Sequence, residues 1–374
     1  MVQLDLNAIP LFDHHCHTLV APEAKADVER LIRVTSEAPV GYPLKDLVET
    51  VTFEAVKKVV GEITGTAVRG PADLGQIFSD IEYETYCRTL FQKNNYQFLL
   101  VDTGFEPEPP MELASLRDVT GTIVHPVLRL ERLAQELRKP GLSFGEWFQK
   151  FTASVSRARQ DGYIGAKSIA AYRSGLAIRP VTSAEAKFAY ERWCEKESPR
   201  LEEGALINFI LWETAPLLIE QGLPLQFHTG YGDPDTDLLK GNPLLLRDFI
   251  EAFSPRGLVI TLLHTYPYHR EAGYLASVYP GVYFDISLII PLGASSARRV
   301  LAEALELAPM SRLLFASDAH TRPEMFALAA MLFRDALRTH FEDPTVSRFV
   351  SGEKLEQWSY MIMNGNAREV YFGR

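Results

Sequence analysis

Cysteine is scarce in this sequence, which has only three, Cys16, Cys87 and Cys194, among 374 residues. Such a set, with no close pair, offers neither a disulfide framework nor a cysteine-based zinc site, and it fits a reducing compartment. No apolar run approaches the roughly 20 residues that span a bilayer. The first residues lack the basic and apolar segments of a signal peptide. We therefore expect a cytoplasmic protein that has no membrane partner.

Basic residues are also fewer than acidic ones. The sequence has 38 Lys and Arg and 48 Asp and Glu, which gives a net charge of -10. Nucleic acid is a poor candidate partner, since phosphate binding requires a basic face. The motifs GxxxxGK[ST] and GxGxxG after a strand are missing. The pattern GxSxG occurs once, as GLSFG at residues 141–145, but inside the long helical connection and not directly after a predicted strand, so it makes no nucleophile elbow. The expected ligand is a small-molecule substrate.

Short apolar runs alternate along the chain with longer amphipathic ones. Runs such as LVITLLH and RLLFAS are apolar throughout, which is typical of strands buried on both faces of a parallel sheet. Eight such strands with helices between them predict an α/β protein of the (β/α)8 TIM-barrel class. The predicted strands cover residues 10–13, 97–103, 121–128, 165–171, 223–228, 258–264, 282–286 and 312–317, and the clearest helices cover 204–221, 243–253, 295–307 and 323–340.

The length fits one barrel domain over residues 1–374. The predicted first and second strands are far apart in the sequence. Residues 20–94 between them are charged and helical in pattern, and we expect a helical insertion over one end of the barrel. A second long connection, at about 129–162, carries more helix.

Metal-binding residue types stand at the ends of four predicted strands. His15 and His17 follow the first strand, His228 and His264 end the fifth and sixth, and Asp318 closes the eighth. The carboxyl ends of barrel strands form the active-site face. The pattern therefore predicts that these side chains converge on one rim.

The motif His15-Cys16-His17 favours a metal ion because alternate side chains of a strand share a face. Zinc accepts neutral imidazole at about 2.0–2.1 Å, and a catalytic site keeps one position open for water. His14 and Cys16 then point the other way, and we do not expect Cys16 to be a nucleophile. Chance would explain this motif if it stood alone.

Asp318 has two interpretations. A carboxylate after an apolar strand can bind a metal and take a proton from the attacking water, and a nearby cation keeps it ionised. An aspartate before a helix can also be an ordinary N-cap. We predict the first role for Asp318, because histidines end the other strands.

The segments FDHHCH, QFHTG, LLHTYP and FASDAH resemble the metal motifs of the amidohydrolase superfamily. The segments GAKSIAAYRSGL, DTDLLKGNPLLLRDFI and MNGNAREVYF look like the branch whose domain is fused to glutamine synthetase in nodulin-like and FluG-like proteins. The resemblance covers nearly the whole chain except residues 20–94. It implies a divalent metal, zinc or otherwise manganese or iron, and a homodimer. No glutamine synthetase segment follows Arg374, so we expect this chain to stand alone.

The resemblance gives Lys167 a particular meaning. In binuclear members of the superfamily, a lysine of the fourth strand is carboxylated, and its carbamate bridges two metals as an anionic oxygen donor. Lys167 stands in the predicted fourth strand. It could instead remain an ammonium group that binds a substrate carboxylate or pairs with an acid, since an isolated buried ammonium is costly.

Further residues are candidates for substrate binding or support. Arg173 offers a planar fork to a carboxylate, although a surface salt bridge is an equal alternative. Asp285 could orient a histidine. We assign no role to His269, His320 or His340, although His320 lies near the rim. The predicted substrate-binding residues are Arg173, Tyr172, His125, Arg129 and Tyr231.

The resulting hypothesis is a metal-dependent hydrolase that attacks an amide, ester or lactone carbon of a small substrate. The resemblance implies that His15, His17 and Asp318 hold one metal, that His228 and His264 hold a second, and that Lys167 bridges them. Asp318 moves the proton. With a single metal, His228 joins its ligands and His264 polarises water or substrate. The alternatives are a metal-dependent decarboxylase of the same superfamily and a non-catalytic metal-binding or regulatory barrel.

Overall fold

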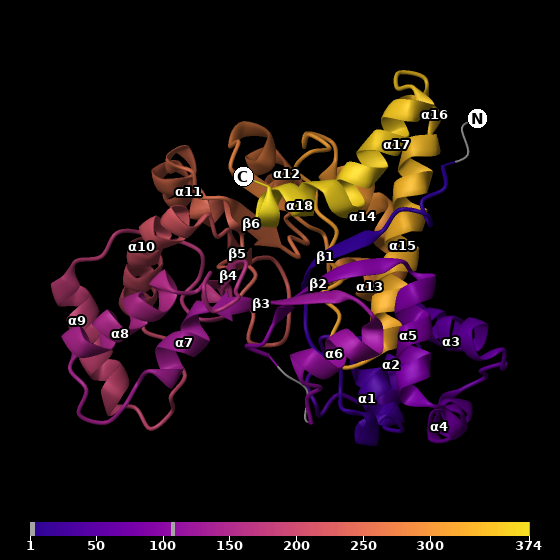
Figure 1. Ribbon diagram of the computed structural model, residues 1–374, viewed down its shortest axis with the longest axis horizontal. Coiled ribbons are helices and arrows are strands. Elements are labelled where there is room, and N and C mark those ends of the chain that lie inside the picture. Colours follow the sequence, from indigo (N-terminus) through magenta and orange to yellow (C-terminus); the bar gives the residue numbers. More distant parts are fainter. Residues whose placement is uncertain (1–3, 106–108, 374) are drawn as a thin grey trace. The chain divides into compact units, whose positions relative to one another are not determined.

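A computed structural model describes residues 4–105 and 109–373, in which helices connect short strands (Figure 1). The strands are β1 (Leu11–Cys16), β2 (Tyr96–Asp102), β3 (Ile123–Arg129), β4 (Ala166–Ser168), β5 (Leu225–His228), β6 (Ile260–Leu263) and β7 (Val282–Phe284).

The α-helices vary from one turn to 20 residues. They are α1 (Val28–Arg33), α2 (Leu44–Leu47), α3 (Val51–Thr64), α4 (Pro71–Asp80), α5 (Tyr83–Lys93), α6 (Leu113–Thr120), α7 (Leu130–Glu136), α8 (Phe144–Ser156), α9 (Ser183–Glu195), α10 (Gly204–Gln221), α11 (Arg247–Phe253), α12 (His269–Val278), α13 (Ile289–Leu292), α14 (Ala297–Ala304), α15 (Pro323–Glu342), α16 (Pro344–Ser347), α17 (Gly352–Tyr360) and α18 (Asn366–Phe372). The 3-10 turns are η1 (Pro22–Ala24), η2 (Ala170–Tyr172), η3 (Pro243–Leu246), η4 (Ser254–Arg256) and η5 (Ala294–Ser296), and η6 (Met361–Gly365) is a π-helical turn.

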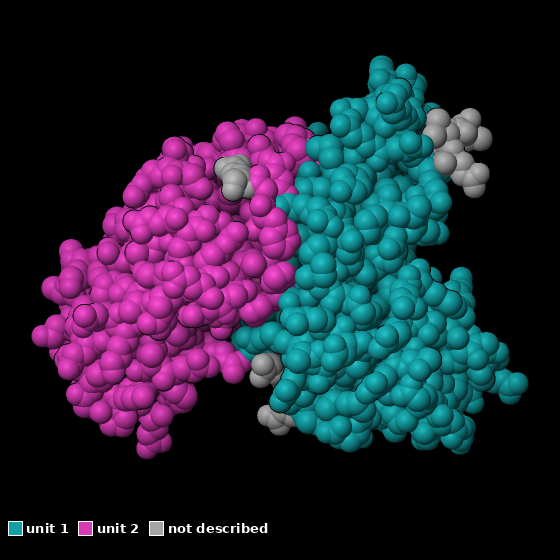
Figure 2. All heavy atoms as spheres, viewed as in Figure 1, with its two compact units in different colours: residues 1–124, 286–306, 313–368 teal, residues 125–285, 307–312, 369–374 magenta. Residues whose placement is uncertain are grey.

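The chain divides into two compact units, coloured teal and magenta in Figure 2. Unit 1 takes residues 1–124, 286–306 and 313–368, and unit 2 takes residues 125–285, 307–312 and 369–374. The prediction of a single domain stays a prediction. None of the helices in the described residues is long and apolar enough to cross a bilayer.

In unit 1, β1 pairs in parallel with β2, and Phe12 lies opposite Phe98. Helix α15 is the centre of this unit. Most of its side chains are buried, and α3, α5 and α14 pack on it. Helix α3 is delimited by its sequence, since the Thr50 side chain caps its N-terminus and Gly65 ends it at a φ of 69°.

In unit 2, β3 to β7 pair in parallel in chain order, so that Lys167 lies level with Arg129 and Gln226. Helices α8, α9 and α10 pack together, and Trp147, Tyr190 and Trp193 form an aromatic core among them. Capping boxes at Ser143 and Thr182 fix the starts of α8 and α9.

The predicted parallel α/β class is confirmed, and seven predicted strands have counterparts in the described residues. Residues 312–317 form no regular strand. Two backbone hydrogen bonds still reach them, since Phe284 N–H donates to the Arg312 carbonyl and His14 N–H donates to the Phe315 carbonyl. The eighth predicted strand therefore has no regular counterpart in the described residues. A closed eight-stranded barrel stays a prediction. Residues between β1 and β2 are largely helical, from η1 to α5.

Candidate metal centre

Strand β1 and the residue after it bring two histidines together in unit 1. His15 is fully buried and His17 nearly so, and their ring centroids lie 5.2 Å apart with nearly perpendicular planes. The Nε2 atoms of His15 and His17 lie 3.2 Å and 3.5 Å from Asp318 Oδ1. The structure thus brings His15, His17 and Asp318 to one point.

His17 is oriented by the end of β2. Its Nδ1 lies 2.9 Å from the backbone carbonyl of Asp102. A carbonyl only accepts, so Nδ1 carries the proton and Nε2 presents its lone pair. One carboxylate oxygen of Asp102 also lies within 4.8 Å of ligand nitrogens of His15 and His17. Asp102 is therefore a further acidic group beside the two imidazoles.

Asp318 stands on a loop that follows residues 312–317. Its backbone has a φ of 51°, a left-handed conformation that aspartate tolerates better than most residues. Its N–H donates to the His15 carbonyl at 3.0 Å, and His17 N–H donates to the Ala319 carbonyl at 2.9 Å. Main-chain bonds therefore hold the Asp318 backbone beside both histidines.

The buried side chain of Asp13 links strand β1 to the segment that precedes Asp318. Asp13 accepts from Ser317 N–H at 3.0 Å, from Ser317 Oγ at 2.5 Å and from His15 N–H at 3.3 Å. Complete burial raises the pKa of Asp13 to about 8. Asp13 contacts the backbone that carries the ligands, so it is a support for the site.

The distances in unit 1 fit a bound cation. Two ligand atoms at about 2.0–2.1 Å from one tetrahedral ion lie about 3.3–3.4 Å apart. The separations of 3.2 Å and 3.5 Å between the imidazole nitrogens and Asp318 Oδ1 match this value. Neutral imidazole and ionised carboxylate are also the donors that zinc and related divalent ions accept.

A second pair of histidines stands at the carboxyl ends of β5 and β6 in unit 2. His228 is the last residue of β5 and His264 directly follows β6, and their ring centroids lie 4.5 Å apart. The Tyr172 ring, at the end of η2, lies 4.2 Å from the His228 ring. Both imidazoles are buried. Unit 2 thus has its own compact histidine group.

Asp285 orients the backbone of His264. Its Oδ1 accepts the His264 N–H at 2.8 Å, and its carbonyl accepts from the Thr265 hydroxyl at 2.7 Å. His264 has a φ of 69°, which needs such external support. Asp285 thus contacts the main chain of His264, and its role in orienting the imidazole stays a prediction.

Lys167 is nearly fully buried in β4, level with Gln226 of β5. Because side chains alternate along a strand, Gln226 and His228 share a face of the sheet, and the register places Lys167 on that face as well. Arg129 ends β3 at the same level. The side chain of Lys167 is thus on the same side of the sheet as His228, which keeps both predicted roles open.

Arg173, directly after η2, is a half-buried cation. Its Nε and Nη1 have no hydrogen-bond partner among the described residues, and burial lowers its pKa, as does Arg200. Glu131 does not compensate directly, because its Oε1 accepts from Ser168 Oγ at 2.6 Å and from Ile169 N–H at 3.1 Å. A guanidinium of this kind suits an incoming carboxylate.

Two other predicted substrate residues lie in different places. Tyr231 lies three residues after His228, and its N–H donates to the Tyr266 carbonyl at 2.8 Å. His125 stands near the start of β3 and contacts Phe372, with ring centroids 5.7 Å apart. Arg129 is four positions further along the strand, or about 13 Å away. The position of His125 therefore does not support a substrate role.

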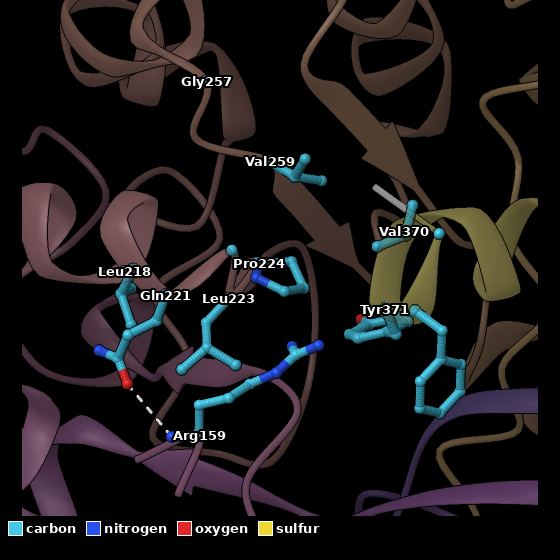
Figure 3. A pocket seen from close by; sticks show the side chains of 12 residues that line it. Arg159, Leu218, Gln221, Leu223, Pro224, Gly257, Val259, Val370 and Tyr371 are labelled. Atoms are coloured by element: carbon cyan, nitrogen blue, oxygen red, sulfur yellow. Dashed lines mark hydrogen bonds between the residues drawn. The ribbon is translucent and has the colours of Figure 1, made fainter. Parts of the chain in front are cut away.

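The pocket in Figure 3 has a volume of about 100 Å³, and its lining includes Leu223, Pro224, Val259, Tyr371 and Phe372. These residues precede β5 and β6 or belong to the C-terminal segment. The pocket is thus at the amino ends of the strands, whereas His228 and His264 are at the carboxyl ends. In barrels the amino end serves stability.

Sequence reasoning missed three residues. Asp102 ends β2 and could have been found by the strand-end rule that selected the histidines. Asp13 gave no such signal, because its partner Ser317 is 304 residues away. Phe105 is 48% exposed although it is apolar, and its ring lies 5.3 Å from His17 and 5.2 Å from His320. Phe105 and His320 together cover one side of His17.

Cys16 donates to the Leu100 carbonyl at 3.5 Å, and burial raises its pKa well above the usual value. It therefore remains a thiol, as expected for a residue that is no nucleophile.

The amidohydrolase family model matches residues 175–373, which is more than half of the chain. The chain therefore belongs to the amidohydrolase family. A solved structure from Lactobacillus casei ATCC 334, described as a proposed metal-dependent hydrolase, is 41% identical, with a TM-score of 0.92 over 98% of this chain and 96% of that one.

Two more distant similarities extend this result. Protein fluG of Emericella nidulans is 30% identical over 97% of this chain, and the chain spans 45% of that protein's length. Uronate isomerase of Thermotoga maritima shares the fold, with a TM-score of 0.68 and 12% identity over 98% of this chain and 95% of the isomerase. The fold therefore occurs in proteins with different named reactions.

Proposed function

We propose that the chain is a metal-dependent hydrolase for a small substrate that carries a carboxylate. The observation that carries the proposal is the convergence of His15 Nε2 and His17 Nε2 on Asp318 Oδ1 at 3.2 Å and 3.5 Å. Family membership and the 41% identical structure described as a proposed metal-dependent hydrolase support it.

His15, His17 and Asp318 would hold the first divalent ion, and zinc, manganese and iron all accept such donors. When bound, the ion supplies Lewis-acid activation of water and of a carbonyl oxygen. The sequence prediction adds His228 and His264, with Lys167 either as a bridging carbamate or as an ammonium group. Asp318 accepts the proton of the attacking water and transfers it to the leaving group.

Two residues that follow β4 are candidates for binding the substrate. Arg173 binds the carboxylate, and Tyr172 contributes an aromatic surface beside His228. Arg129 and Tyr231 are further candidate contacts. A homodimer and a cytoplasmic location belong to the same proposal.

The direct test combines metal analysis with a substrate panel. The purified protein should contain zinc, manganese or iron by mass spectrometry, and it should hydrolyse at least one carboxylate-bearing amide, ester or lactone. Asp318→Asn should lower that turnover by about 10²–10⁴-fold, the usual contribution of a general base. A protein that takes up no metal, or an Asp318→Asn variant with full activity, would contradict the proposal.

Decarboxylation is a second candidate, favoured by the buried Arg173 nitrogens that lack partners. In that reaction Arg173 would hold the carboxylate that leaves as carbon dioxide. A substrate labelled with ¹³C at the carboxylate distinguishes the two reactions. Hydrolysis keeps the label in the acid product, whereas decarboxylation releases it as carbon dioxide.

A further inference from the structure

The loop that presents Asp318 contains two residues in the left-handed conformation. Asp318 has a φ of 51° and Thr321 a φ of 67°. A positive φ is a true outlier for a β-branched residue such as threonine, and it persists only where the surroundings impose it. The contacts of this loop should therefore show what holds it.

One side of the loop is held by the main chain. Asp318 N–H donates to the His15 carbonyl at 3.0 Å, Thr321 N–H donates to the Thr18 carbonyl at 2.9 Å, and Val20 N–H donates to the Thr321 carbonyl at 3.0 Å. These bonds align the loop with β1 and its continuation. The part of the loop that leads into α15 must be held by other contacts.

Arg322 and Glu324 occupy that side, and both are fully buried. Arg322 Nε and Nη2 donate to the two carboxylate oxygens of Glu324 at 3.1 Å and 3.0 Å, and its Nη1 donates to the Lys25 carbonyl at 2.6 Å. The Tyr86 hydroxyl donates to Glu324 Oε1 at 3.0 Å, and the guanidinium lies 4.3 Å from the Phe78 ring centroid.

Stability alone does not explain a charged pair at this place. Burying two ions is costly, and a well-packed apolar pair of similar volume is often as stable or more so. A bidentate arginine–carboxylate pair has a feature that an apolar pair lacks, since its two parallel hydrogen bonds have a defined direction. The pair is therefore suited to fixing an orientation.

We propose that Arg322 and Glu324 are positioning residues that fix the Asp318 loop and are themselves fixed by Tyr86 of α5 and Phe78 of α4. The helical segment between β1 and β2 thereby takes part in building the metal centre. The importance of this loop for catalysis rests on the proposed function. The claim that Arg322 and Glu324 hold the loop in place does not depend on it.

The first experiment compares two tyrosines whose hydroxyl groups both donate a hydrogen bond to a residue of α15. Tyr86→Phe removes the bond to Glu324, and the control Tyr96→Phe removes the 2.8 Å bond to the Phe326 carbonyl. Hydrogen exchange of the Asp318 and Thr321 amides should be at least fivefold faster in Tyr86→Phe than in Tyr96→Phe. Equal exchange rates in the two variants would overturn the proposal.

The second experiment separates positioning from stability. The double variant Arg322→Met/Glu324→Leu replaces the ion pair with an apolar pair, and Glu324→Gln leaves Arg322 without its charge partner. We expect the double variant to melt at a higher temperature than Glu324→Gln, and to bind Zn²⁺ about tenfold more weakly than the unaltered protein in competition with a chromophoric chelator. A double variant with unaltered zinc affinity and unaltered loop exchange would refute the role.

The two proposals fail in different ways. If the unaltered protein binds none of Zn²⁺, Mn²⁺ and Fe²⁺, the proposed function fails, and exchange of the loop amides in the metal-free protein still decides the positioning role. If Zn²⁺ binds but the Tyr86 and Tyr96 variants exchange equally, only the positioning role fails.

Discussion

The residues around the two histidine groups differ between the units. In unit 1 the side chains of Asp13, Asp102 and Asp318 surround or support two imidazoles, and four main-chain hydrogen bonds join residues 318–321 to residues 15–20. In unit 2 the histidine pair has Lys167 on the same face of its sheet, and Arg173 holds a charge with unpartnered nitrogens. The acidic group is suited to a cation, and the basic group is suited to an anion.

The largest expected effect comes from removing each histidine pair in turn. His15→Ala/His17→Ala should bind less than a tenth of the metal held by the unaltered protein, because two of three converging donors are lost. His228→Ala/His264→Ala should retain at least half of it. Metal content of the purified variants checks this, with circular dichroism to confirm folding. Equal losses in the two double variants would show that the units do not differ in this respect.

A second test concerns the anion side. Arg173→Met should raise KM for a carboxylate substrate by about 10–100-fold, since a charged hydrogen bond contributes about 1.5–3 kcal/mol. Metal content should not change. The matching amide of the same substrate serves as control, because its KM should be almost the same for both proteins. A similar rise in KM for both substrates would exclude carboxylate recognition by Arg173.

A third test sharpens the role of Asp285. Asp285→Ala removes the acceptor of the His264 N–H, and loss of such a supporting partner typically costs about 10–100-fold in metal affinity. Asp285→Asn keeps an acceptor oxygen, so it should cost less. Zinc titration of both variants checks the order, and equal losses in the two variants would mean that the charge of Asp285, and not its hydrogen bond, is what matters.

The smallest effect is expected at Gly232. A Cβ at this position would lie 1.9 Å from Tyr172 Oη, so Gly232→Ala must displace the ring that lies beside His228. We expect a cost of about 1 kcal/mol in substrate binding, or about fivefold in KM. Gly145→Ala is the control, because no heavy atom lies within 4 Å of its Cβ. Unchanged KM in Gly232→Ala would separate Tyr172 from the substrate.

Much of this arrangement was predictable from local sequence pattern. Apolar runs located the seven strands to within a few residues, and α10 was predicted with its observed bounds, Gly204–Gln221. Residues 312–317 were apolar enough to suggest a strand, but their few backbone bonds do not make a ladder. Strand β4 is shorter than predicted because the chain turns into η2 after Ile169.

The strand-end rule found His15, His17, His228, His264 and Asp318, since it needs only the order of elements. It does not select His125, which lies near the start of β3 and not at its carboxyl end. It could not find the contact of Asp13 with Ser317 or of Tyr86 with Glu324, which join residues 304 and 238 positions apart. Such contacts depend on tertiary packing that no local pattern encodes.

The main-chain anchoring of residue 318 has a consequence for how the site can vary. Its amide is held by the His15 carbonyl, and no atom of its own side chain takes part in that bond. Asparagine tolerates the same left-handed backbone, so an exchange at this position changes the chemistry while the scaffold keeps its shape. Related proteins on this scaffold could thus acquire or lose a reaction by one substitution, without having to refold the loop around it.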